Sequence, residues 1–245
     1  MKRLLYILAI FFAAALPAKA QFSSYGVNGA IGYSYITDDI IAAKGLLSYS
    51  GGISITYGFD KAKSVMADYF FIRSGLNLVH RGGFFEADYK INATTSMHRS
   101  GYYKAYYLQL PILPSVRFDF SNSNAKQYLV AYLGPALCFG VFGKFSDECV
   151  DADHPLAAIN YKIIDDPVFD HANRFDLDAI LGVAYQYNNW ELRAYMDYGF
   201  LSLGDIEDVL KTFENQQQGT NEKTTIPTGN VVSFMFSLGY NFPIR

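Results

Sequence analysis

The chain has 245 residues, of which 51% are hydrophobic, 17% aromatic and 18% charged, and its formal net charge is −3. Charged residues are scarcer than in an ordinary soluble domain, where they make up about 25%, and an acidic chain without basic clusters predicts no nucleic-acid partner. After the N-terminal segment, no apolar run approaches the roughly 20 residues that a membrane-spanning helix needs. Apolar residues are therefore plentiful but interrupted, which favours a membrane β-barrel over a helical membrane protein.

The first twenty residues have the features of a secretory signal peptide. Two basic residues follow Met1, an apolar run ends at Leu16, and Ala18-Lys19-Ala20 precedes a polar glutamine. A basic start, a short apolar core and an Ala-x-Ala site are typical of a cleaved leader, and less so of a retained anchor helix. We predict a signal peptide over residues 1–20 and one outer-membrane β-barrel domain over 21–245, whose formal charge becomes −6 when the three basic residues of the leader are removed.

Alternating hydrophobicity recurs along the rest of the chain. In residues 47–59 every odd position is apolar, aromatic or Gly, and every even position is small and polar or Gly. A period of two indicates a β-strand with two unlike faces. Ser and Gly suit a narrow barrel lumen, whereas a soluble strand would carry charges on its wet face, so we interpret the apolar face as facing lipid. In chain order, the predicted strands are residues 25–35, 47–59, 69–81, 106–120, 128–142, 175–187, 190–200 and 232–242.

The connections between these strands alternate between three short polar turns and four longer loops, among them residues 82–104 and 144–174. Even strand numbers, short periplasmic turns and long external loops are typical of outer-membrane barrels, as are aromatic residues at both strand ends. We therefore predict an all-β fold, an eight-stranded antiparallel up-and-down transmembrane β-barrel, with one short loop helix over residues 205–216. Three prolines lie inside predicted strands and predict β-bulges there: Pro111, Pro114 and Pro135.

The strand phase also predicts which charged side chains point into the lumen. Charges inside a membrane barrel need partners or water, because an unpaired buried charge is very costly. We predict a structural salt-bridge network that plugs the interior. The alternative, an ion path, is weaker because eight strands leave little space beyond their own side chains. The predicted network consists of Arg73, Arg117, Asp176, Asp178, Glu191, Arg193 and Asp197.

Two further features indicate chemistry only weakly. Carboxylates in the acidic loop 144–174 are a calcium-binding alternative, but the loop lacks the pattern of an EF-hand, and we prefer a solvated loop. Cys138 and Cys149 would lie in an oxidising compartment, where a disulfide remains an alternative to a free, buried Cys138. We predict no cofactor, no metal site and no catalytic residue.

An enzyme of the outer leaflet is the main alternative function. Some small outer-membrane barrels act on lipids with a His beside a Ser nucleophile at the external rim. No Gly-x-Ser-x-Gly elbow or metal-ligand spacing accompanies the histidines of this chain, so we predict that the protein is not an enzyme. The histidines at or beyond the predicted rim are His80, His98, His154 and His171.

Several short motifs resemble those of the PorT-like outer-membrane β-barrel family of Gram-negative bacteria. The resemblance covers the whole mature chain and implies an eight-stranded barrel. Because the founding member of the family is tied to the type IX secretion system, that role is one option that the resemblance implies. The chain departs from the family in its long acidic loop after the fifth strand and in Pro243-Ile244-Arg245, which displaces the terminal aromatic signal. The motifs are Gly75-Leu76, Leu108-Gln109-Leu110-Pro111, Leu133-Gly134-Pro135, Tyr195-Met196-Asp197-Tyr198-Gly199 and Leu238-Gly239-Tyr240-Asn241-Phe242.

These patterns predict an exported, non-enzymatic integral protein of the cell outer membrane. Its expected partners are outer-membrane lipid and an envelope protein that contacts the external loops, since loops are where binding function usually lies. The role is structural or partner-binding, with a secretion or envelope complex as one setting. A lipid-modifying enzyme, a small-solute or ion pore and a soluble periplasmic carrier are the alternatives.

Overall fold

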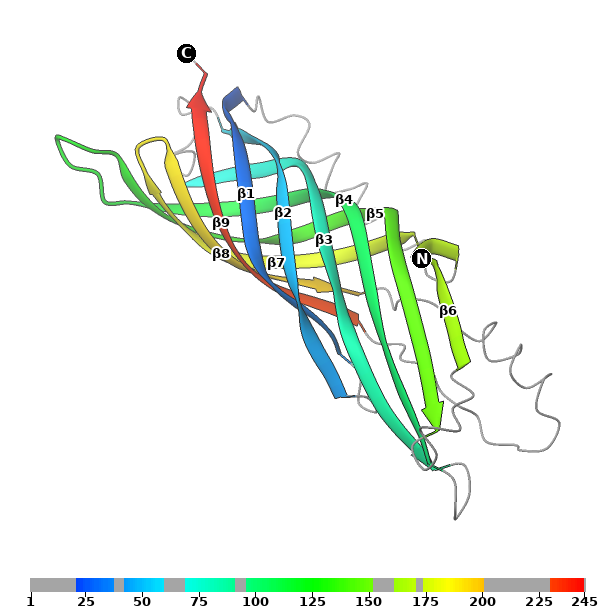
Figure 1. The fold of residues 1–245 in the computed structure, drawn as a ribbon. Helices are drawn as coiled ribbons and strands as arrows, with labels where there is room; N and C mark the ends of the chain where they lie inside the picture. Colours follow the sequence, from blue (N-terminus) through cyan, green and yellow to red (C-terminus); the bar gives the residue numbers. More distant parts are fainter. Residues whose placement is uncertain are drawn as a thin grey trace.

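The computed structural model is a closed β-barrel with one sheet that projects beyond it (Figure 1). It describes residues 21–37, 42–59, 69–90, 96–151, 161–170, 174–200 and 230–244. The elements within these ranges are β1 (Gln21–Thr37), β2 (Ala42–Gly58), β3 (Phe70–Lys90), β4 (Ser96–Asp119), β5 (Gln127–Asp151), β6 (Tyr161–Pro167), the 3-10 turn η2 (Val168–Asp170), β7 (Phe175–Tyr187), β8 (Trp190–Gly199) and β9 (Asn230–Pro243).

Eight of these strands form a ring in which each strand pairs with a neighbour on both sides. The order is β4-β3-β2-β1-β9-β8-β7-β5, and β4 pairs with β5 to close the ring. All of these pairings are antiparallel. The predicted eight-stranded barrel is therefore confirmed. The ninth strand, β6, pairs with β5 from Lys144 onward, beyond Phe139, which is the last β5 residue that pairs with β7.

The two faces of the barrel agree with the predicted orientation. Ile53, Leu133 and Phe236 face outward with 56%, 59% and 64% of their surface exposed, whereas Ser54 and Ser237 on the alternate phase are buried inside. A contiguous outer surface of Leu, Ile, Val and aromatic side chains is the surface that lipid tails solvate. The apolar face of the strands therefore lies on the outside of the barrel, and the Ser- and Gly-lined face encloses the interior.

Aromatic side chains mark both ends of the outer surface. At the turn end, Tyr25 stacks on Phe242 with ring centroids 5.1 Å apart. At the loop end, four rings follow one another across β2, β3, β4 and β5, with centroid distances of 4.6, 4.8 and 4.3 Å. We call Tyr49, His80, Tyr106 and Phe142 the loop-end aromatic row. Such rings occupy the headgroup level of membrane barrels, so the lipid-facing band lies between the two ends.

Two segments predicted as loops are partly strands, and this is the main correction to the sequence-based fold. Residues 82–90 and 96–104 pair with each other as far as Lys90 opposite Ser96, and β5 continues to Asp151 opposite Met97. With β6, they form the sheet that projects past the loop-end aromatic row (Figure 1). Gly and charged residues at these positions break the lipid-facing alternation, because this sheet is outside the hydrocarbon layer and its faces need not be apolar.

The β4–β5 pair contains one β-bulge or similar irregularity, as expected for these strands, but it does not lie at the prolines. Pro111 pairs with Ala136 and Ser115 pairs with Tyr132, and both pairs have the same β4–β5 register. The three β4 residues between Pro111 and Ser115 have no β5 partner. The one β4–β5 register shift lies at Tyr106/Tyr107, away from the prolines. Because proline has no N–H to donate, the ladder opens locally at these positions and its register does not slip.

Several predictions fall on residues that the structure does not describe. The signal peptide over 1–20 and the loop helix over 205–216 lie outside the described residues. Among the described residues, no helix is both long and apolar enough to cross a membrane.

A charge placed on the outer face tests its contact with lipid. Leu133→Arg lies on the exposed central part of β5, where we expect a loss of about 2–4 kcal/mol in the free energy of unfolding from lipid vesicles. The same change at Ser123, in the exposed turn between β4 and β5, should have little effect, because the Ser123 hydroxyl makes only a 3.4 Å hydrogen bond to the neighbouring Asn124 side chain. Urea titrations of both variants in vesicles measure the difference, and equal stabilities would contradict a lipid-facing β5.

Candidate functional site

The lumen at the turn end holds a buried ion-pair cluster, which we call the Glu191 cluster. Arg73 on β3 donates from Nη2 to Glu191 Oε2 over 2.6 Å. Arg193 on β8 donates from Nε to Glu191 Oε1, and the Asn241 side-chain amide donates to Oε2 over 3.4 Å. All four residues are at most 9% exposed. Strand alternation brings them together, because each is on the inward phase of its strand.

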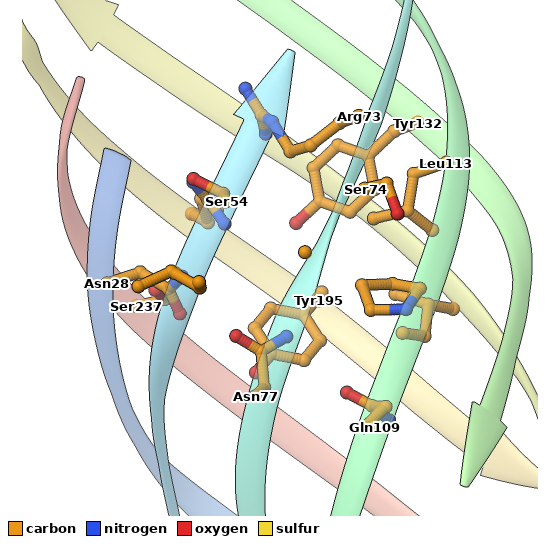
Figure 2. A pocket seen from close by; sticks show the side chains of 15 residues that line it. Asn28, Ser54, Arg73, Ser74, Asn77, Gln109, Leu113, Tyr132, Tyr195 and Ser237 are labelled. Atoms are coloured by element: carbon orange, nitrogen blue, oxygen red, sulfur yellow. The ribbon is translucent and has the colours of Figure 1, made fainter. Parts of the chain in front are cut away.

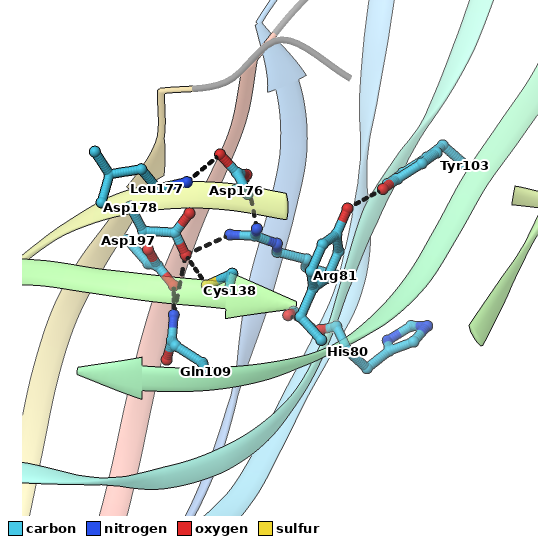
Figure 3. A network of polar contacts seen from close by, with 11 residues as sticks. His80, Arg81, Tyr103, Gln109, Cys138, Asp176, Leu177, Asp178 and Asp197 are labelled. Carbon is cyan, nitrogen blue, oxygen red and sulfur yellow. Dashed lines mark hydrogen bonds and ion pairs between the residues drawn. The ribbon is translucent and has the colours of Figure 1, made fainter. Parts of the chain in front are cut away.

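A second cluster lies nearer the loop end, around the guanidinium of Arg81 (Figure 3). Arg81 donates from Nη1 to Asp178 over 2.7 Å and from Nη2 to Asp176 over 2.8 Å. Gln109 donates from its side-chain amide to both Asp178 and Asp197, over 3.0 and 2.7 Å. These five residues form the Arg81 cluster. Its carboxylates are buried, and each lies within reach of a charged or amide donor, as low-dielectric surroundings require.

The Arg81 cluster is enclosed by aromatic and sulfur-containing side chains. The Arg81 guanidinium carbon lies 4.3 Å from the ring centre of Tyr107, and the Tyr107 and Tyr103 hydroxyls are hydrogen-bonded. Cys138 is free and buried, and its thiol donates to Asp178 over 2.8 Å. The predicted free, buried state of Cys138 is therefore confirmed, and the stacked cation and the thiol fill the lumen around the ion pairs.

The structure brings together six of the seven residues predicted for the lumen network, in two separate groups. The seventh, Arg117, lies outside both clusters, half-buried at the turn end with its guanidinium carbon 5.3 Å from the ring centre of Tyr128. Sequence reasoning missed Arg81, although it has the inward phase of Arg73 on the same strand. The predicted strand ended at Arg81, and the predicted lumen network did not include the Arg81 side chain.

Between the two clusters the lumen contains a small cavity of about 30 Å³, lined by both polar and apolar side chains (Figure 2). Arg73 and Arg193 line it from the Glu191 cluster and Gln109 from the Arg81 cluster. Tyr132 and Tyr195 add their rings to the wall. The cavity has room for roughly two water-sized species, and among the described residues the side chains of the two clusters fill the lumen on either side of it.

The other candidate chemistry finds no support in the described part of the chain. His80 lies in the loop-end aromatic row between Tyr49 and Tyr106, and the nearby Ser48 hydroxyl donates to the backbone carbonyl of His80, not to its ring. The side chains of the other three histidines are outside the described residues. Within the described ranges, no three His, Cys, Asp or Glu side chains form a metal-binding group.

A closed antiparallel ring with an apolar outside, two aromatic ends and a charged, packed interior defines a transmembrane β-barrel. The chain matches the family model described as "Outer membrane protein beta-barrel domain" over residues 18–206, which is more than half of its length. It belongs to this family and is an outer-membrane β-barrel protein.

Solved structures of outer-membrane proteins are similar to this chain at low identity. Ail, the attachment invasion locus protein of Yersinia pestis, in complex with the heparin analogue sucrose octasulfate, has 14% identity and a TM-score of 0.37, covering 90% of this chain and 98% of that one. Neisserial surface protein A has 13% identity and a TM-score of 0.32, covering 89% and 97%. LpxR from Salmonella typhimurium has 8% identity and a TM-score of 0.22, covering 90% and 100%. With scores this low, nothing about the function of this chain follows from these structures. None of the curated proteins compared with the chain matches it.

Removing the central cation of the lumen should destabilise the barrel strongly. In Arg81→Gln, Asp176 and Asp178 stay buried without their ion-pair partner, and we expect a loss of about 3–5 kcal/mol in the free energy of unfolding. The additional change Asp178→Asn should restore part of it, because it removes one uncompensated charge. Urea unfolding in lipid vesicles measures both values.

The matched control for that experiment is the exposed ion pair outside the barrel. Lys44 and Glu86 are 2.7 Å apart, with side chains 63% and 40% exposed. Such a pair contributes at most about 1 kcal/mol, so Lys44→Gln should have a small effect. A loss for Arg81→Gln no larger than that for Lys44→Gln would contradict the buried-network interpretation.

Proposed function

We propose that this outer-membrane protein is a non-enzymatic binding protein that contacts a protein partner of the cell envelope through its projecting sheet and external loops. The observation that carries the proposal is the extension of β3, β4 and β5 beyond the loop-end aromatic row. The first residue of β4, Ser96, precedes Tyr106 of that row by ten residues. At ~3.4 Å per residue, the paired strands reach about 30 Å past the lipid-facing band.

The projecting sheet has properties that suit protein binding. It is held by continuous backbone pairing between β3 and β4 and between β4 and β5, so that it presents a fixed surface. Its last strand, β6, pairs with β5 and has no second partner within the described residues. An unpaired strand edge offers backbone N–H and C=O groups to which an extended peptide can add.

The packed interior supports a binding role over a transport role. The Glu191 and Arg81 clusters fill the lumen with ion-paired side chains, and the cavity between them is about 30 Å³. An eight-stranded barrel with a filled interior leaves no path for a solute. The remaining surface on which function can reside is the loop end.

The setting of the partner follows from the sequence resemblance and from the location. A PorT-like protein in an outer membrane is a candidate component of a secretion or envelope complex, and type IX secretion is the system that the resemblance favours. Outer-membrane lipid is the second partner, in contact with the apolar band. Neither partner requires a catalytic residue or cofactor, and no nucleic acid is involved.

Shortening the projecting sheet tests the partner. Glu86 lies opposite Ser100, so replacing residues 87–99 by Asn-Gly joins β3 and β4 through a tight hairpin turn and leaves the barrel strands intact. In cross-linked cells, we expect the partner recovered with the wild-type protein to fall at least tenfold at equal barrel abundance.

The matched control is a Gly-Ser insertion after Ser123, in the exposed turn at the opposite end of the barrel. It should recover as much partner as the wild type. A wild-type protein that cross-links to nothing, or a shortened variant that retains the partner, would count against the proposal.

Conductance measurements test the exclusion of a pore. Reconstituted in planar bilayers, the protein should give no stable single-channel steps, because both charged clusters lie across the lumen. The outcome that contradicts this is a steady, ohmic conductance that responds to neutralising Arg73 or Arg81.

A further inference from the structure

We propose that the lumen cavity beside Arg73 and Arg193 is a binding site for one small monovalent anion of halide size. The site lies inside the barrel, away from the projecting sheet, and goes beyond the proposed partner-binding function. It rests on the charge of the Glu191 cluster, on the donors left over in it, and on the size of the cavity that these donors line.

The Glu191 cluster carries one positive charge more than it can neutralise. Two guanidinium groups, those of Arg73 and Arg193, share the single carboxylate of Glu191. Both carboxylate oxygens already accept hydrogen bonds, with Oε2 accepting from Asn241 as well as from Arg73. A buried, uncompensated charge is costly, so the cluster is stabilised by any anion that reaches it.

The leftover donors belong to side chains that line the cavity. Arg73 Nε and Nη1 and Arg193 Nη2 are buried and have no hydrogen-bond partner among the described residues. Ser237 Oγ, also without a partner there, adds a hydroxyl that can rotate to donate. All three residues are among those around the cavity (Figure 2). Their N–H and O–H groups are the ligands that a halide accepts from proteins, because such donors direct positive hydrogen atoms toward it.

The size of the cavity selects the class of anion. A volume of about 30 Å³ holds one or two water-sized species, which fits chloride or bromide better than sulfate, phosphate or an organic carboxylate. Water would satisfy the donors but would leave the excess positive charge in place. The Arg81 cluster has the opposite imbalance, with three carboxylates for one guanidinium, and Asp178 Oδ1 and Asp197 Oδ1 are buried without a hydrogen-bond partner among the described residues. Its carboxylates pair with Arg81 and Gln109, so Glu191 is the carboxylate that Arg73 and Arg193 share.

Bromide is the direct probe for this site. Crystals of the full-length mature protein, purified from outer membranes in detergent and grown in sodium bromide, should give an anomalous bromine peak in the cavity between Arg73 and Arg193. Ordered water density at that position without an anomalous signal would overturn the proposal, as would bromine peaks on the outer surface alone.

Thermal unfolding of the same preparation is the second measurement. In sodium chloride or bromide the apparent unfolding temperature should rise saturably, by roughly 3 °C over sodium gluconate of equal ionic strength, and sodium sulfate should give no such rise. Arg193→Gln should abolish the halide effect because it removes the excess charge, whereas Lys44→Gln should retain it. If Arg193→Gln does not fold, the wild-type comparison decides, and equal temperatures in halide and gluconate would refute the site.

Discussion

The structure depends on one constraint, which is that no backbone polar group may face lipid without a partner. The closing pair β4–β5 and the pair between the first and last strands, β1–β9, together remove every edge from the ring. The stretch of β4 that contains the prolines is a local exception to this constraint, and it shows that the register is kept even there. Where β4 and β5 lose their pairing for three residues, the register resumes unchanged, because a slip would turn every following side chain to the wrong face.

The low dielectric constant of the membrane and of the narrow lumen also determines which side chains the interior contains. A narrow ring has to fill its centre, and small residues at the closest approaches make space for larger ones elsewhere. At Gly26, for example, an added Cβ would lie 2.7 Å from the Asn241 side-chain oxygen, and Asn241 in turn bonds to Glu191. Charges are tolerated there only because strands far apart in the sequence bring acids and bases together. The interior is therefore as specific as a hydrophobic core, although it is made of ion pairs and amides.

The barrel was predictable from the sequence because its physical cause is periodic. Alternation fixes the phase of each strand, and the phase alone identifies Arg73, Glu191 and Arg193 as neighbours in the lumen. What the phase does not give is the point where a strand ends. Arg81 was the last residue of the predicted strand and was not included in the predicted network, but it is the centre of the second cluster, because β3 continues nine residues further, to Lys90. Pairing partners also depend on register, which is a property of two strands and is not visible in either one alone.

Beyond the loop-end aromatic row, the outward-facing positions of β4 and β5 are no longer restricted to apolar side chains, because these positions face water instead of lipid. Lys104, two residues from Tyr106 on the outward phase, lies with its ammonium nitrogen 4.3 Å from the ring centre of Tyr102, and Lys144 faces it on β5. Two lysines opposite each other would be costly in hydrocarbon and acceptable at a wet surface. The strands β3, β4 and β5 therefore continue from the lipid-facing band into the aqueous side, and their pairing is maintained across this boundary apart from the β4–β5 register shift at Tyr106/Tyr107. Inside the membrane their sequence is constrained by lipid and by the lumen, whereas beyond it the same strands are free to carry charges and polar side chains.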